Sequence, residues 1–108
     1  MKSFRTPLMA FALLALVCSV VPATLAQDGV ETVCLVTDLG RVNDGTFNQF
    51  AHEGAEAVTE DYDLEYRFIE TQSETDYETN INTCVEEGFD VVITVGFLIQ
   101  DATLNAAI

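Results

Sequence analysis

The chain has 108 residues, and its 18 acidic residues face only four lysines and arginines, which gives a net charge of −14. Such a composition argues against nucleic acid and anionic lipid surfaces as partners, because both are bound mainly through lysine and arginine. A single histidine and three cysteines without paired spacing predict neither a metal site nor another cofactor.

The first 26 residues have the layout of a secretory signal peptide. Lys2 and Arg5 precede an apolar stretch over residues 8–21, and the small residue Ala26 is followed by a polar segment. The stretch is shorter than the roughly 20 residues of a membrane span. An uncleaved membrane anchor and a lipid on Cys18 are the alternatives. Cleavage after Ala26 leaves two arginines against 18 acidic residues, a net charge of −16, on an exported protein of the periplasm or cell surface.

The first predicted strand and helix follow directly. Residues 32–38 form a short apolar run bounded by turn residues, which predicts a buried strand. The helix is expected to begin near Thr46, which forms a capping box with Gln49. Its predicted apolar face consists of Phe47, Phe50, Ala51, Gly54, Ala55 and Val58.

Two more strands and helices complete the pattern. Residues 64–70 alternate in polarity, which predicts a strand near the edge of a sheet. A helix over 74–87 has Ser73 as its predicted N-cap and ends at Gly88. Its inner face is expected to consist of Tyr77, Ile81, Cys84 and Val85. Residues 90–96 form a continuous β-branched run, expected to be covered by helices on both faces, and another helix follows.

This alternation predicts an α/β fold with a parallel sheet in three layers and right-handed crossovers. We expect the strand order to be 2-1-3. Ligands of such sheets bind beyond the carboxyl ends of the strands. The stretch "LGRVNDGTF" follows the first strand there, and "GFLIQ" follows the third. The chain stops within an apolar helical pattern, so residues 27–108 are interpreted as part of a longer protein.

The turn after the first strand has the composition of a binding loop. Gly40 and Gly45 allow close backbone approach, and Asp38 offers hydrogen-bond acceptors. Phe47 either packs in the core or presents its ring to a flat ligand, and the Asn48 amide can read the edge of a heteroaromatic ring. The turn matches neither glycine-rich phosphate motif, so a neutral, flat, hydrogen-bonding ligand is favoured.

These residues resemble the basic membrane protein family of ABC-transporter substrate-binding proteins, which includes purine-nucleoside-binding lipoproteins of bacteria. The resemblance lies in Thr37-Asp38 at the strand end, in "DGTFN" from Asp44, in Glu53-Gly54, and in Gly96-Phe97. It implies a periplasmic-binding-protein fold of two lobes, with residues 27–108 as the first part of lobe one.

The family resemblance also implies roles for single residues. Asp38 would hydrogen-bond a base, Phe47 would stack on it, and Asn48 with the turn backbone would support both. His52 stands where the family often has tyrosine or tryptophan, and it is either a pocket donor or an ordinary helix-surface residue. The candidate ligand-binding residues are Asp38, Asp44, Phe47, Asn48, His52, Gly96 and Phe97.

The function expected from this resemblance is extracytoplasmic solute binding for an ABC transporter. The protein would capture a purine nucleoside or a similar small ligand and deliver it to an ABC permease. Contact with the membrane would come only through the permease or a lipid anchor. The alternatives are an exported ligand-sensing domain of the same fold and a binding protein for a sugar-like solute. No nucleophile lies beside a base in the pattern, so an enzyme is not expected.

Cys34 and Cys84 remain after the signal peptide is removed, and export favours an oxidising compartment. In strand order 2-1-3 the second helix crosses over the first strand, so the two cysteines can form a disulfide. The alternative is two separate buried cysteines.

Overall fold

The computed structural model describes residues 29–108, so the predicted signal peptide lies outside the described residues. The three strands are β1 (Thr32–Leu39), β2 (Glu65–Thr71) and β3 (Val91–Thr94). The helices are α1 (Phe47–Asp61), α2 (Tyr77–Glu86) and α3 (Gln100–Ala106), and a short 3₁₀ helix, η1 (Glu74–Asp76), leads into α2.

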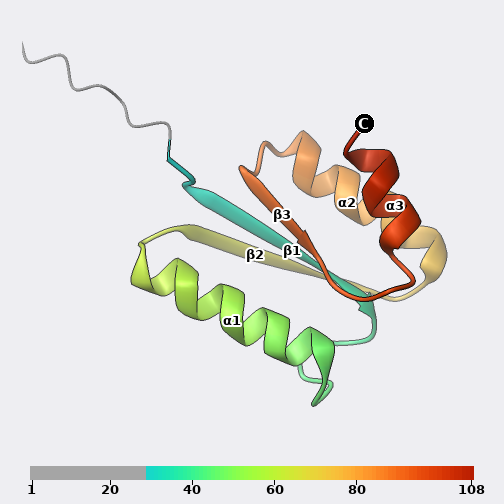
Figure 1. Ribbon diagram of the computed structural model, residues 1–108, viewed down its shortest axis with the longest axis horizontal. Coiled ribbons are helices and arrows are strands. Elements are labelled where there is room, and N and C mark those ends of the chain that lie inside the picture. The colour runs from blue at the N-terminus through green and yellow to red at the C-terminus, as the bar shows by residue number, and fades with distance from the viewer. Residues whose placement is uncertain (1–28) are drawn as a thin grey trace, which may run out of the picture.

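The strands form one parallel sheet in the order β2-β1-β3, with α1 on one face and α2 and α3 on the other (Figure 1). The predicted α/β fold in three layers is therefore confirmed, including the central place of the first strand. β2 lies at an edge, as its alternating pattern predicts. No helix within residues 29–108 has the length and apolarity needed to cross a bilayer.

The central strand β1 divides the core in two, because successive side chains of a strand point to opposite faces. Cys34 and Val36 point toward α2 and α3 and belong to a cluster of seven buried residues. Leu35 points the other way and forms a smaller buried cluster with Ala55 of α1 and Val95. The two helical layers are thus anchored by alternate residues of the same strand.

The buried face of α1 differs from the predicted apolar face. Phe47, Phe50 and Val58 are 73%, 67% and 51% exposed, whereas the buried residues are Asn48, Ala55 and Thr59. Small residues let α1 lie close to the sheet. The hydroxyl of Thr59 donates to the carbonyl oxygens of Ala55 and Glu56, so this polar side chain can be buried without a lost hydrogen bond.

The expectation that the third strand is covered on both faces is wrong. All four residues of β3 are only half-buried. α1 contacts β1 and β2 and leaves one face of β3 open, which creates an apolar groove of about 570 Å³. Val91 and Ile93 of β3 line this groove together with Val58 of α1.

α2 is attached to the sheet by a covalent bond as well as by packing. Cys34 and Cys84 are joined in a disulfide, with their Cα atoms 6.0 Å apart. Tyr77, Ile81 and Cys84 form the buried face of the helix, as predicted, but Val85 is half exposed. The predicted cap at Ser73 is wrong, since its side chain makes no capping hydrogen bond to η1 and the N-cap position of α2 is Asp76.

Candidate ligand-binding site

A cleft of about 210 Å³ opens at the carboxyl ends of β1 and β3, beside the first turn of α1. This is the edge of the sheet where parallel α/β folds bind their ligands. Six of the seven candidate ligand-binding residues line it: Asp38, Asp44, Phe47, Asn48, Gly96 and Phe97. Leu39, Thr46 and Leu98 complete the lining.

The apolar groove over β3 is larger but chemically unsuited to a polar ligand. Its walls are mostly aliphatic side chains of β1, β3 and α1. A small-molecule site needs a few convergent polar groups to orient the ligand. The cleft at the carboxyl ends has these groups, and it is therefore the candidate site.

Asp44 builds the turn that leads into α1. Its carboxylate accepts hydrogen bonds from the Thr46 N–H and hydroxyl, both at 2.7 Å, and from the Gln49 N–H at 3.1 Å. The predicted capping box is therefore wrong, since the Thr46 side chain does not cap the helix and Asp44 does. Desolvation works to raise the pKa of Asp44, but the hydrogen bonds from Thr46 and Gln49 outweigh it and lower this pKa below its usual value.

The side chain of Asp38 is aimed by an irregularity in β1. The pairing with β2 shifts between Val36 and Leu39, and at this bulge the Thr37 hydroxyl oxygen accepts the N–H of Thr71 at 2.9 Å. A bulge commonly redirects a side chain at a functional site. Asp38 is half-buried here, and its Oδ1 atom accepts the Leu39 N–H at 2.7 Å and the hydroxyl of Tyr77.

Gly96 is required by the position of Asp38. A Cβ atom placed on Gly96 would lie 2.0 Å from Asp38 Oδ2, well inside any tolerated contact. The residue also has φ of +100°, a backbone conformation that side chains other than hydrogen disfavour. The loop after β3 therefore leaves no room for a side chain at position 96 beside the carboxylate.

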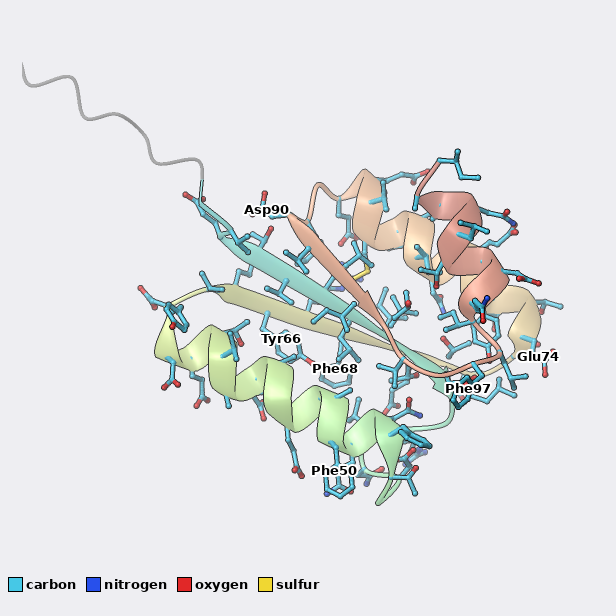
Figure 2. The ribbon with its side chains drawn as sticks, viewed as in Figure 1. Phe50, Tyr66, Phe68, Glu74, Asp90 and Phe97 are labelled. Carbon is cyan, nitrogen blue, oxygen red and sulfur yellow. A yellow bond between two sulfur atoms is a disulfide. The ribbon has the colours of Figure 1, made fainter. Side chains whose placement is uncertain are left out.

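Two phenylalanine rings at the cleft are largely uncovered. Phe47 is 73% exposed and Phe97 is 83% exposed, so core packing, the alternative for Phe47, is wrong. Figure 2 shows Phe97 at the carboxyl end of the sheet, whereas Phe50 points away from the sheet and does not line the cleft. Exposed aromatic faces beside polar groups suit a flat, partly polar ligand.

Asn48 adds a buried amide to the cleft wall. Its side chain is 2% exposed, and its Oδ1 atom has no hydrogen-bond partner among the described residues. A buried acceptor without a donor costs free energy, on the order of 1–3 kcal/mol. Within residues 29–108, Asn48 Oδ1 is therefore a buried acceptor for which the protein supplies no donor.

His52 is the candidate residue that does not reach the cleft. Its Nδ1 atom lies 2.8 Å from the hydroxyl oxygen of Tyr66, and its ring meets the Phe68 ring edge-on with centroids 4.7 Å apart. Figure 2 shows Tyr66 and Phe68 between β2 and α1. The structure thus places His52 against the sheet and offers no geometric support for a ligand contact.

Tyr77 makes a contact at the candidate site that sequence reasoning missed. It was assigned only to the core, yet its hydroxyl contacts Asp38 at the cleft. Burial, together with the hydrogen bond and charge of Asp38, raises the pKa of Tyr77 to about 12, so the phenol remains a donor at neutral pH. The available signal was that a buried tyrosine hydroxyl needs a polar partner.

Comparison with known proteins identifies the family of the chain. The family described as "Bmp: ABC transporter substrate-binding protein PnrA-like" matches residues 31–107. The chain is 40% identical over 76 residues to a "CD4+ T-cell-stimulating antigen" of Listeria monocytogenes, covering 66% of this chain and 21% of the relative. A protein of the same description from Listeria innocua matches equally.

A third relative carries a ligand in its name. The "ABC transporter nucleoside-binding protein BmpA" of Lactococcus lactis is 38% identical over 77 residues, which cover 68% of this chain and 22% of that protein. The chain thus spans about a fifth of the length of these relatives. Since the family match covers most of the described residues, the chain belongs to the Bmp family of PnrA-like ABC transporter substrate-binding proteins.

Proposed function

We propose that the complete protein captures a purine nucleoside, or a similar small ligand, outside the cytoplasm and delivers it to an ABC permease. The observation that carries this proposal is the pairing, in one cleft, of the exposed Phe47 ring with the Asp38 carboxylate. A purine presents a flat face for stacking and N–H groups for an acceptor at its edge. The name of the Lactococcus lactis relative supports the same ligand class.

On this proposal each cleft residue has its own role in binding. Phe47 stacks on the base, Asp38 accepts an N–H from it, and the buried Asn48 supports both from the cleft wall together with the turn backbone. Phe97 adds apolar surface from the loop after β3. Asp44 acts through the turn, because its three hydrogen bonds hold the start of α1.

The proposal extends beyond the described residues. Residues 27–108 would form the first part of one lobe, and the opposite wall of the site would come from a second lobe. Residues 1–26 would be removed on export, with membrane contact only through the permease or a lipid anchor. Mass spectrometry of the exported protein tests this, with Gln27 as the expected first residue.

Calorimetry on the complete protein tests the ligand class. Adenosine, guanosine and inosine are titrated alongside ribose and a set of amino acids. At least one nucleoside should bind, whereas ribose and the amino acids should not. Binding of a sugar or an amino acid in place of every nucleoside would overturn the proposal.

Asp38→Asn tests the site within the same experiment. The substitution keeps the shape of the side chain but replaces one acceptor by a donor. Nucleoside affinity should fall much more than the melting temperature of the free protein does. Equal losses of affinity and melting temperature would assign Asp38 a structural role instead.

A further inference from the structure

Tyr77 connects the best-packed part of the core to the cleft. Its ring is 4% exposed and belongs to the same buried cluster as Cys34 and Ile81. Its hydroxyl reaches out of this cluster to Asp38 Oδ1. The ring is therefore fixed by packing, and the position of its hydroxyl is fixed with it.

The two oxygens of Asp38 are in different situations. Oδ1 accepts two hydrogen bonds, one from the Leu39 N–H and one from Tyr77. Oδ2 receives no hydrogen bond from residues 29–108 and lies beside Gly96 at the cleft. An ionised carboxylate has about four acceptor positions on its two oxygens. The protein therefore occupies one oxygen and leaves the other for a donor.

We propose that Tyr77 is the positioning residue of this site: by holding Asp38 Oδ1 it presents Oδ2 as a single acceptor and makes the cleft select ligands that offer an N–H there. The inference rests on the proposed nucleoside binding. Gly96 completes the arrangement, because any side chain at that position would collide with Oδ2. A hydrogen bond from a fixed donor costs less ordering than one made to a free side chain.

Tyr77→Phe removes the hydroxyl and keeps the ring. Dissociation constants are measured for inosine, whose base carries an N–H, and for purine riboside, whose base carries none. In the wild type, inosine should bind more tightly. The variant should reduce this preference by about tenfold, the scale of one hydrogen bond to a charged group, while purine riboside binds as before.

Tyr66→Phe is the matched control. The hydroxyl of Tyr66 in β2 also makes a side-chain hydrogen bond, but its partner is His52 and Tyr66 does not line the cleft. This variant should leave the ratio of the two dissociation constants unchanged. If Tyr77→Phe does not fold, Tyr77→Met removes the hydroxyl while a flexible side chain fills the space.

A measurement without ligand separates this inference from the proposed function. Tyr77→Phe, Asp38→Ala and the double variant are compared for their melting temperatures, and the two changes should be clearly non-additive. Additive shifts, or an unchanged preference for inosine in a protein that binds nucleosides, would overturn the role of Tyr77. If the wild type binds no nucleoside, the proposed function is overturned, and the role of Tyr77 in ligand selection is overturned with it. This holds even if the effects of Tyr77→Phe and Asp38→Ala on the melting temperature are non-additive.

Discussion

The two faces of the sheet are held by different amounts of packing. On the face of α2 and α3, seven buried residues form one cluster, and a disulfide joins β1 to α2. On the face of α1, the buried cluster within residues 29–108 consists of Leu35, Ala55 and Val95, and the groove of about 570 Å³ lies beside it. We therefore expect the first face to dominate stability and the second to tolerate change.

The cleft takes one wall from each of these layers. Asp38 is held from the tightly packed face through Tyr77, whereas Phe47 and Asn48 belong to α1 on the loosely packed face. A ligand in the cleft would connect the two layers at the end of the sheet. Substitutions on the face of α2 and α3 should thus mainly change the free energy of unfolding. Substitutions of α1 residues at the cleft should mainly change ligand affinity.

Removing the disulfide should have the largest effect. Cys34→Ala combined with Cys84→Ala opens a loop with a sequence separation of 50. In the chain-entropy model such a bond stabilises by about 4 kcal/mol. Urea unfolding of the complete protein measures the loss. Two free thiols in wild-type protein purified without reductant would show that the bond does not form.

Ile81→Ala compares the two faces directly. Ile81 is 3% exposed within the larger cluster, so its truncation should lower the free energy of unfolding by about 3 kcal/mol. Val58→Ala on α1 is the matched control, since Val58 is 51% exposed at the groove, and it should cost about 0.5 kcal/mol or less. Similar losses from both substitutions would remove the distinction between the faces.

Phe47→Ala should weaken nucleoside binding by about 1–3 kcal/mol, the scale of stacking between a base and an aromatic ring. Its stability should change little, because the ring is 73% exposed. Phe50→Ala is the control, as Phe50 lies on the same helix, is 67% exposed and does not line the cleft. Calorimetry that finds equal affinities for both variants would reject stacking by Phe47.

The smallest effect concerns the opposite end of the sheet, where Asp90 joins the starts of β1 and β3 (Figure 2). Its Oδ2 atom accepts the Glu31 N–H at 2.9 Å and the Thr32 N–H and hydroxyl at 3.0 Å. These hydrogen bonds lower the pKa of Asp90 below 3.8, and the bond from the Glu31 N–H has the largest effect. The contribution of the Asp90 carboxylate to the stability of the folded protein is therefore fully present above pH 3.8. It is lost as the pH falls through the lowered pKa of Asp90 in the folded protein.

Asp90→Asn checks this assignment. The variant should be slightly less stable than the wild type at neutral pH, because an amide oxygen accepts these hydrogen bonds more weakly than a carboxylate does. The difference should shrink as the pH falls below 3.8. A difference that stays constant from pH 7 to pH 2 would contradict it.

Local sequence predicted the order of elements, because apolar runs bounded by turn residues are local signals. Residues 32–38 and 90–96 fall on β1 and β3 for this reason. The orientation of α1 was not predictable in this way. Its phenylalanines fit a helical apolar face, yet the residues buried on the sheet side are Asn48, Ala55 and Thr59. Which face of the helix meets the sheet depends on long-range packing, which a local pattern does not contain.

The sequence likewise predicted part of the cleft lining but not the contact that lies behind it. Asp38, Phe47 and Gly96 follow from the position of the loops at the carboxyl ends of the strands and from the family resemblance. Tyr77 lies 39 residues from its partner, so no local pattern connects it to Asp38. The cover of β3 depends on which helix lies over it, which is likewise a long-range property.

The disulfide has one more consequence, for how a cleaved chain behaves. Trypsin cuts after lysine and arginine, and within residues 29–108 only Arg41 and Arg67 qualify. Both lie between the bonded Cys34 and Cys84, and Arg41 is in the exposed turn before α1. A chain nicked at either arginine would therefore remain one covalent molecule on a gel until a reductant releases the pieces.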